Sequence, residues 1–311
     1  MVGVVVRPTL CQATQISRGG FSIRGSIIMS SAFSERGNIA LNFDVLCDSE
    51  PECTRTAWRC AHDLWPDVMT HASDLSDEPW QAGARRAWTG GDWGPLQGDG
   101  EDGLPNWLAF KMRQLRPTIE SDYEALLLIR LCAEEALTSV RAERGERPLT
   151  PGEISANWSY LRESLLVRYC LKKEEAIAAT CAARDAWLNE DKESWLRAHC
   201  LYPGAREAMN TALASTLDGS LYVTTAKERR FVHELLQSEG LDLDEERIFG
   251  LESGSKLKTL LTLKEQHGSD LLSIVEDRCG ILALSCSMNR LVRTPASSCT
   301  RLSHMLLWRV F

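Results

Sequence analysis

The sequence predicts an α/β fold: a doubly wound parallel sheet that carries an inserted domain made of helices. Three short apolar runs indicate buried strands at residues 39–43, 221–225 and 271–275, and each leads into a helical pattern or polar strand end. Alternating strands and helices are typical of parallel sheets with right-handed crossovers. Residues 104–200, in contrast, are helical in pattern throughout, with no strand pattern between them.

Composition indicates a soluble globular protein of one large or two smaller domains. The chain has 311 residues, of which 44% are hydrophobic and 25% charged, and this balance is ordinary for globular proteins. It has no window of about 20 consecutive apolar residues, the length that a transmembrane helix needs. The formal net charge of -8 argues against a nucleic-acid-binding protein, which needs a basic face. We therefore expect neither a membrane nor a nucleic acid as partner.

The cysteines do not indicate a metal or redox site. There are 11 of them, scattered without a C-x-x-C pair, whereas zinc sites and redox dithiols usually show close spacing. We expect buried, apolar-like side chains and free thiols, with a disulfide or metal role as the alternative.

Residues 1–37 differ in composition from the rest of the chain. Their basic residues are all arginines, serines are frequent, and Glu35 is the only acid. This composition is typical of an organelle transit peptide. A disordered N-terminus, or upstream sequence wrongly included in the chain, is the alternative.

The stretch from Asn38 to Glu52 organises the predicted sheet. An apolar run, residues 39–41, is followed by Asn42 and Asp44, and a helix is expected to open near residues 48–51. In an open α/β sheet the chemistry lies at the carboxyl ends of the strands. Side-chain oxygens at such a strand end are suitable ligands for a hard cation such as Mg²⁺.

Apolar spacing and turn residues predict the other elements and the domain boundaries. The expected helices cover residues 52–64, 105–113, 119–135, 153–169, 173–190, 192–199, 205–215, 227–238 and 255–267, with a further strand at 247–250. Residues 67–103, rich in Gly, Asp, Pro and Trp, are predicted to be irregular. The predicted domains are a discontinuous α/β core of residues 38–65 and 201–278, a helical insertion of 66–200, and a divergent tail of 279–311.

Basic residues on the predicted insertion could recruit an anionic substrate, and a solvated helix face is the alternative. They are Lys111, Arg113, Arg116 and Arg130.

The stretch at 38–52 resembles the first motif of the haloacid-dehalogenase-like (HAD) hydrolases, written hhhhD-x-D-G. It is similar to the DFDGVLCDSEPE run of plastid and cyanobacterial HAD-like proteins. Later strings follow in the order of that family: Thr224 lies near the end of LYVTT, Lys256 lies in GSK at a helix start, and Glu276 and Asp277 follow LLSIV. The resemblance covers residues 38–278. It implies a Rossmann-like HAD core with a helical cap, and a chloroplast location, with the cytoplasm as the alternative.

The resemblance implies a phosphatase-type hydrolase that uses Mg²⁺ and acts on a small phosphorylated metabolite. A residue at position 42 would attack phosphorus, and Asp44 would serve as acid and base. Thr224 would hydrogen-bond a phosphoryl oxygen, and Lys256 would offset negative charge. The implied magnesium ligands are Asp44, Glu276 and Asp277.

Two departures from the family pattern bear on catalysis. Asn42 occupies the position of the nucleophilic aspartate, and the glycine after Asp44 is missing. A neutral amide cannot form an acyl-phosphate, so we expect hydrolysis to be absent or heavily reduced. The alternative is a non-catalytic HAD-fold protein that binds a metabolite or a protein partner, and whether the chain is an enzyme stays open. An all-helical interaction protein is a remote third reading, which requires the three apolar runs not to be strands.

Overall fold

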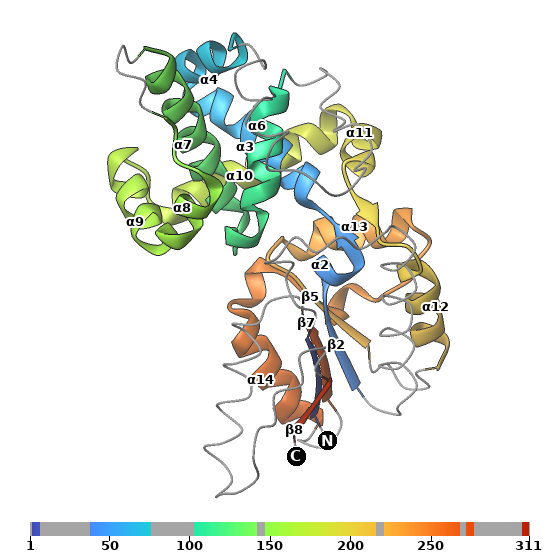
Figure 1. Cartoon of the computed structure of the whole chain (residues 1–311). Helices are drawn as coiled ribbons and strands as arrows, with labels where there is room; N and C mark the ends of the chain where they lie inside the picture. The colour runs from blue at the N-terminus through green and yellow to red at the C-terminus, as the bar shows by residue number, and fades with distance from the viewer. Residues whose placement is uncertain are drawn as a thin grey trace, which may run out of the picture. The chain divides into compact units, whose positions relative to one another are not determined.

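A computed structural model describes residues 2–6, 38–75, 103–141, 147–215, 221–267, 272–276 and 307–310, the first and the last two ranges by backbone alone. The chain forms two compact units (Figure 1). One is an α/β unit made of Met1–Asp48 and Cys200–Phe311, and the other is a helical unit made of Ser49–His199.

The α/β unit is built on a largely parallel sheet with strand order β6-β5-β2-β7-β1-β8. Its strands are β1 (Val2–Val6), β2 (Asn38–Asn42), β5 (Leu221–Thr224), β6 (Ile248–Phe249), β7 (Leu272–Glu276) and β8 (Leu307–Val310). All neighbouring pairs are parallel except β1 with β8. The four predicted strands are thus confirmed to within one or two residues at their ends, which excludes the all-helical reading.

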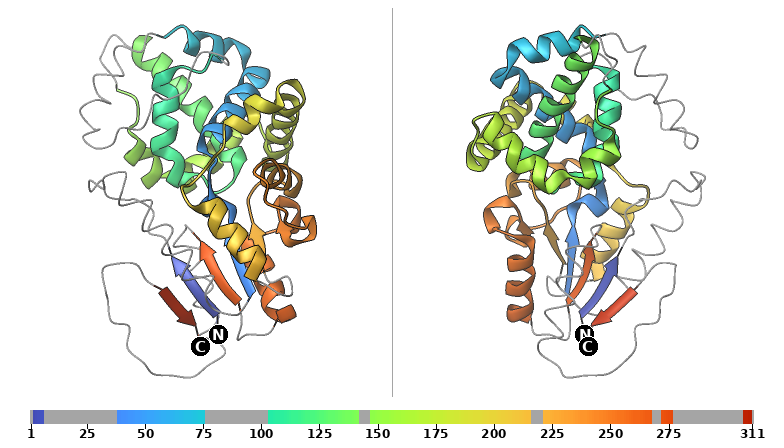
Figure 2. Two further views of the ribbon diagram at one scale, coloured as in Figure 1. Left: turned by 90° about the vertical axis from the view of Figure 1, so that its right-hand side faces the viewer. Right: turned by 60° about the vertical axis from the view of Figure 1, so that its left-hand side comes forward.

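Helices on both sides explain why the strands are continuous apolar runs. The consecutive residues Ile39, Ala40 and Leu41 of β2 are all buried, as expected for a parallel strand covered on both faces. Figures 1 and 2 show α14 (Lys256–His267) on one side of the sheet and α12 (Ala205–Ser215) on the other. After β6 at one edge of the sheet, the chain continues to β7, on the other side of β2.

Short elements complete the α/β unit. They are α2 (Phe43–Leu46), β3 (Cys47–Asp48), β4 (Cys200–Leu201), α13 (Arg229–Ser238), and the 3-10 helices η2 (Glu245–Arg247) and η3 (Leu251–Ser253). β3 pairs antiparallel with β4, so the two segments that lead to and from the helical unit are joined. Gly240 follows α13 with φ of 71°, which confirms the expected glycine end of that helix.

The helical unit is organised around α7, which is buried along most of its length. Its helices are α3 (Glu50–Leu64), α4 (Pro66–Ser73), α6 (Asn106–Leu115), η1 (Arg116–Thr118), α7 (Asp122–Arg141), α8 (Pro151–Ala156), α9 (Trp158–Arg168), α10 (Lys173–Glu190) and α11 (Lys192–Arg197). α3, α4, α6, α9 and α10 all pack on α7, so the insertion is a helical bundle. No described helix is both long and apolar enough to span a membrane.

Several predicted elements differ from the structure, among them the helix expected over 119–135, since α7 runs from Asp122 to Arg141. The segment expected to be irregular from residue 67 begins with helix α4, because Pro66 occupies its first turn and Met69 and Ala72 are buried. The helix expected over 153–169 is interrupted at Asn157. Helix α3, assigned from sequence to the α/β core, belongs to the helical unit because it packs on α7 and α10. Apart from β1 and β8, the segments 1–37 and 279–311 lie outside the described residues.

Candidate functional site

Three of the predicted site positions lie at the ends of neighbouring parallel strands. Asn42, the last residue of β2, is paired with Thr224, the last residue of β5. On the other side of β2, Leu41 is paired with Val275, and Glu276 follows at the same edge. The carboxyl ends of parallel strands share one edge of the sheet, where open α/β proteins place their sites. The sheet therefore brings positions 42, 224 and 276 together, while their roles stay predictions.

Asp44 does not extend the strand, although the sequence suggested a strand through residue 43. β2 ends at Asn42, whose backbone already forms the N-cap of α2. Asp44 lies half-buried in the first turn of α2. Its neighbours Phe43, Val45 and Leu46 are all buried. Asn42 itself is only 1% exposed.

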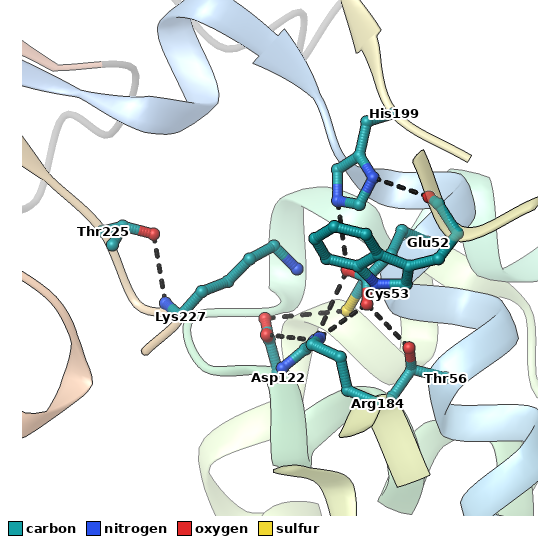
Figure 3. A network of polar contacts seen from close by, with 9 residues as sticks. Glu52, Cys53, Thr56, Asp122, Arg184, His199, Thr225 and Lys227 are labelled. Carbon is teal, nitrogen blue, oxygen red and sulfur yellow. Dashed lines mark hydrogen bonds and ion pairs between the residues drawn. The ribbon is translucent and has the colours of Figure 1, made fainter. Parts of the chain in front are cut away.

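The loop after β5 carries a functional candidate that the sequence analysis missed. Lys227 was expected to begin a helix, but α13 begins at Arg229 and Lys227 is only 3% exposed. Lysine is rarely so buried. Its backbone N–H donates a hydrogen bond of 3.1 Å to the Thr225 hydroxyl (Figure 3). The signal available in the sequence was the run Thr-Thr-Ala-Lys directly after a buried strand.

The thiol of Cys47 shows which charges lie near this edge. Burial raises the pKa of Cys47 far above its usual value, and the Asp48 carboxylate raises it further. Asp44 also raises the pKa of this thiol, whereas Lys227 lowers it. Asp44 on α2 and Lys227 in the loop after β5 thus have opposite effects on the pKa of this thiol.

The remaining predicted site residues are Lys256, Glu276 and Asp277, which the structure describes to different extents or not at all. Lys256 is the first residue of α14 and is half-buried. Because α14 follows β6, its N-terminus starts from the same carboxyl edge. Glu276 is described by its backbone alone, and Asp277 lies outside the described residues.

The described part of the chain does not complete the predicted magnesium site. It contains no group of three or more His, Cys, Asp or Glu side chains suited to hold a metal. Of the predicted ligands only the side chain of Asp44 is described, with the amide of Asn42 as a neutral oxygen donor nearby in sequence. A magnesium ion takes six oxygen ligands, more than the side chains of Asp44 and Asn42 could supply.

A second polar cluster, which the sequence analysis did not foresee, lies inside the helical unit (Figure 3). Arg184 donates from Nε to Glu52 Oε1 at 2.6 Å and from Nη2 to Asp122 Oδ2 at 2.6 Å. Thr56 donates its hydroxyl to Glu52 Oε1 at 2.7 Å, and His199 Nε2 lies 3.7 Å from Glu52 Oε2. This network ties α3, α7 and α10 together.

The electrostatics of this cluster indicate a structural role. Arg184 is 1% exposed and Glu52 is 0% exposed. Burial acts to lower the pKa of Arg184, but the Glu52 and Asp122 carboxylates outweigh it and the pKa is raised. The guanidinium thus stays charged inside the bundle and is matched by carboxylates that are already in contact with it.

Most of the basic residues considered for substrate recruitment are engaged within the helical unit. Arg113 pairs with Glu50 at 3.1 Å, and Arg130 pairs with Glu134 at 2.8 Å. Arg116 donates to the backbone carbonyl of Ile119 at 3.3 Å. These contacts hold the three guanidinium groups within the helical unit, whereas the alternatives expected an anion-recruiting face or a solvated helix face.

Comparison with known proteins identifies no relative of this chain: searches against family models, curated proteins and solved structures find no match. What the chain does must therefore be inferred from the residues at the sheet edge.

Proposed function

We propose that this chain is a HAD-like α/β protein with an inserted helical cap. On this proposal its sheet edge binds the phosphate group of a small phosphorylated metabolite and hydrolyses the ester weakly or not at all. The observation that carries the proposal is the pairing of Asn42 with Thr224 at the carboxyl edge, together with the buried Lys227 three residues beyond Thr224.

The topology supports the family part of the proposal. β2, which bears the altered first motif, lies between β5 and β7, which bear the second and fourth motifs. The chain leaves the α/β unit directly after β2, α2 and β3, and it returns at β4. The resemblance expects the cap after the first strand and helix, from residue 66, so the chain leaves the unit earlier than expected, although after the same strand. Helices on both sides of the sheet fit a doubly wound core.

The chemistry at the edge suits a phosphate group. The Thr224 side chain is 4% exposed, and no side-chain hydrogen bond of this residue occurs within the part of the chain that the structure describes. Its hydroxyl can therefore donate to a phosphoryl oxygen without breaking a described contact. The ammonium groups of Lys227 and Lys256 would supply positive charge, which favours binding of a phosphate dianion.

Catalysis is where the proposal predicts a defect. An ionised carboxylate at position 42 could attack phosphorus, but the Asn42 amide is neutral and a very poor nucleophile. Asp44 retains a carboxylate that could exchange a proton with a leaving group. A site with Asn42 and Asp44 is therefore expected to bind a phosphorylated metabolite without hydrolysing it. Asn42 thus favours the alternative of a non-catalytic, metabolite-binding protein.

Restoring the family motif tests this function. The unmodified chain and a variant with Asn42→Asp plus a glycine inserted after Asp44 are compared for phosphate release from phosphomonoesters in the presence of Mg²⁺. We expect release near background from the unmodified chain and a rise of about 100-fold or more in the variant, because a missing nucleophile costs at least that much.

The same assay can contradict the proposal. Robust turnover by the unmodified chain, lost on Asp44→Asn, would show an active enzyme with a remodelled site. A lack of activity in the restored variant, with folding retained, would argue against a HAD-type site.

A further inference from the structure

Two backbone hydrogen bonds connect the loop that carries Thr225 and Lys227 to residues at the end of β6 and just after it. The Thr225 N–H donates to the Phe249 carbonyl at 3.0 Å, and the Leu251 N–H donates to the Lys227 carbonyl at 2.8 Å. These hydrogen bonds continue the pairing of β5 with β6 beyond the sheet. The loop conformation therefore depends on residues 249–251.

Glu252 makes a further contact with the end of the same loop, through its side chain. Its carboxylate accepts from the Arg229 backbone N–H at 3.2 Å and 3.3 Å, one distance to each oxygen. The Arg229 guanidinium also lies 3.4 Å from this carboxylate. Because Arg229 is the first residue of α13, Glu252 satisfies an N–H that the helix itself leaves without a partner.

Gly250 permits the close approach of the two segments. A Cβ atom at position 250 would lie 2.8 Å from the Lys227 carbonyl oxygen and closer still to the Arg229 amide nitrogen. Both are backbone atoms, so they cannot rotate away as a flexible side chain would. The φ of this residue is -91°, so glycine is needed here for space and not for backbone strain.

We propose that Gly250 and Glu252 are positioning residues for the phosphate site. They fix the loop that follows Thr224 and set the place of the buried Lys227, although neither is assigned a contact with the ligand. This inference rests on the proposed function, since it states how the site is held in shape for a phosphate group. A misplacement of about 1 Å in such a site costs up to about 100-fold in binding or rate.

The test uses the full-length chain with inorganic phosphate as the probe. Dissociation constants are measured for the unmodified chain, Gly250→Ala, Glu252→Ala and Glu252→Gln. Hydrogen exchange of the Thr225 and Leu251 amides is followed by NMR in the same samples. Gly152→Ala and Glu246→Ala are the matched controls, because a Cβ at position 152 has no neighbour within 4 Å and Glu246 is exposed.

We expect Gly250→Ala to raise the dissociation constant at least tenfold and to speed exchange of both amides at least tenfold. Glu252→Ala should have a smaller effect in the same direction. Glu252→Gln should recover most of the affinity, because its amide oxygen still accepts from the Arg229 N–H. The two controls should bind phosphate as the unmodified chain does.

The readouts separate this inference from the proposed function. If the unmodified chain does not bind phosphate, the proposed function is wrong. Independently of binding, an unchanged rate of amide exchange in Gly250→Ala would overturn the positioning role. If the unmodified chain binds phosphate, unaltered affinity in both Gly250→Ala and Glu252→Ala would overturn it. If Gly250→Ala does not fold, the phosphate affinities and amide exchange rates of Glu252→Ala and Glu252→Gln decide the question instead.

Discussion

At position 42, an amide nitrogen stands where a phosphatase of this kind would need a carboxylate oxygen. Asn42 is almost fully buried, so the exchange does not serve solubility or a surface contact. An aspartate there would place a negative charge opposite the incoming phosphate, whereas an amide does not repel it. On the proposed function, the neutral Asn42 would therefore favour retention of an anion over attack on it.

Burial also sets the reactivity of the cysteines, which gives a prediction for single residues. Burial raises the pKa of Cys60 to about 12, with a further contribution from the Asp63 carboxylate, and burial likewise raises the pKa of Cys132. Thiols react as thiolates, and the ordinary thiol pKa is about 8.5. At pH 8, iodoacetamide should label the exposed Cys170 and Cys200 at least tenfold faster than Cys60 and Cys132.

Mass spectrometry of the native protein after timed labelling measures these rates, and labelling in urea provides the control in which all thiols react. Rapid labelling of Cys60 without denaturant would contradict the packing of α3.

The sequence allowed the position of a polar residue to be predicted where that residue ends a strand. It did not allow this where the burial of the residue depends on segments far away in the sequence. Asn42 and Thr224 could be placed from the strand ends, because parallel strands bring such ends to one edge. Lys227 could not, since lysine at a helix start is usually solvated and nothing local indicates that residues 249–251 cover it. The role of Glu52 was likewise hidden, because its partner Arg184 is 132 positions away.

The helices of the inserted unit are held by one buried charge network as well as by apolar packing. Glu52 on α3, Asp122 on α7 and Arg184 on α10 meet where these helices pack together. Burying charges is costly, and a buried pair is tolerated when each charge is matched and hydrogen-bonded. Thr56 contributes one of the hydrogen bonds to Glu52.

Removal of the central cation should therefore destabilise the bundle. We expect Arg184→Met to lower the free energy of unfolding by about 3–5 kcal/mol, because two carboxylates are left without their cation in a buried site. Urea unfolding followed by circular dichroism measures this loss. Arg197→Met is the control: Arg197 pairs with Glu193 at 3.7 Å on an exposed surface, and exposed pairs contribute about 0–1 kcal/mol.

A double variant separates charge from shape. Adding Glu52→Gln to Arg184→Met should recover part of the lost stability, because one of the uncompensated charges is removed. Equal stability of Arg184→Met and the unmodified chain would mean that the network does not hold the helices.

Length alone did not decide how well an element was predicted. Helices α10 and α12 have the predicted bounds, whereas α7, the longest described helix, begins three residues later and ends six residues later than expected. The four-residue helix α2 has no periodicity to detect. Pro66 was predicted only to end a helix. In the structure it also begins the next helix, α4, because proline is compatible with the first turn of a helix.

For the molecule as a whole, the sequence predicted an insertion between two halves of an α/β unit. The long stretch without strand patterns made this possible, and the structure confirms a separate helical unit. The boundary was less predictable: α3 follows β2 closely in sequence, but its apolar face belongs to the core formed with α7 and α10. Membership of a unit is decided by packing, which local sequence does not reveal.

The central claim is that the carboxyl edge of the sheet binds a phosphate ester, and calorimetric titration tests it most directly. The full-length chain is titrated with phenyl phosphate in the presence of Mg²⁺, alongside Thr224→Val and Lys227→Met, with Lys258→Met on the exposed face of α14 as the control. A hydrogen bond to a charged group contributes about 1.5–3 kcal/mol, so each site variant should weaken binding by about 10- to 100-fold. We predict saturable binding by the unmodified chain and by the control, with weakened binding in both site variants. Absence of binding, or equal affinity in all four proteins, would contradict the claim.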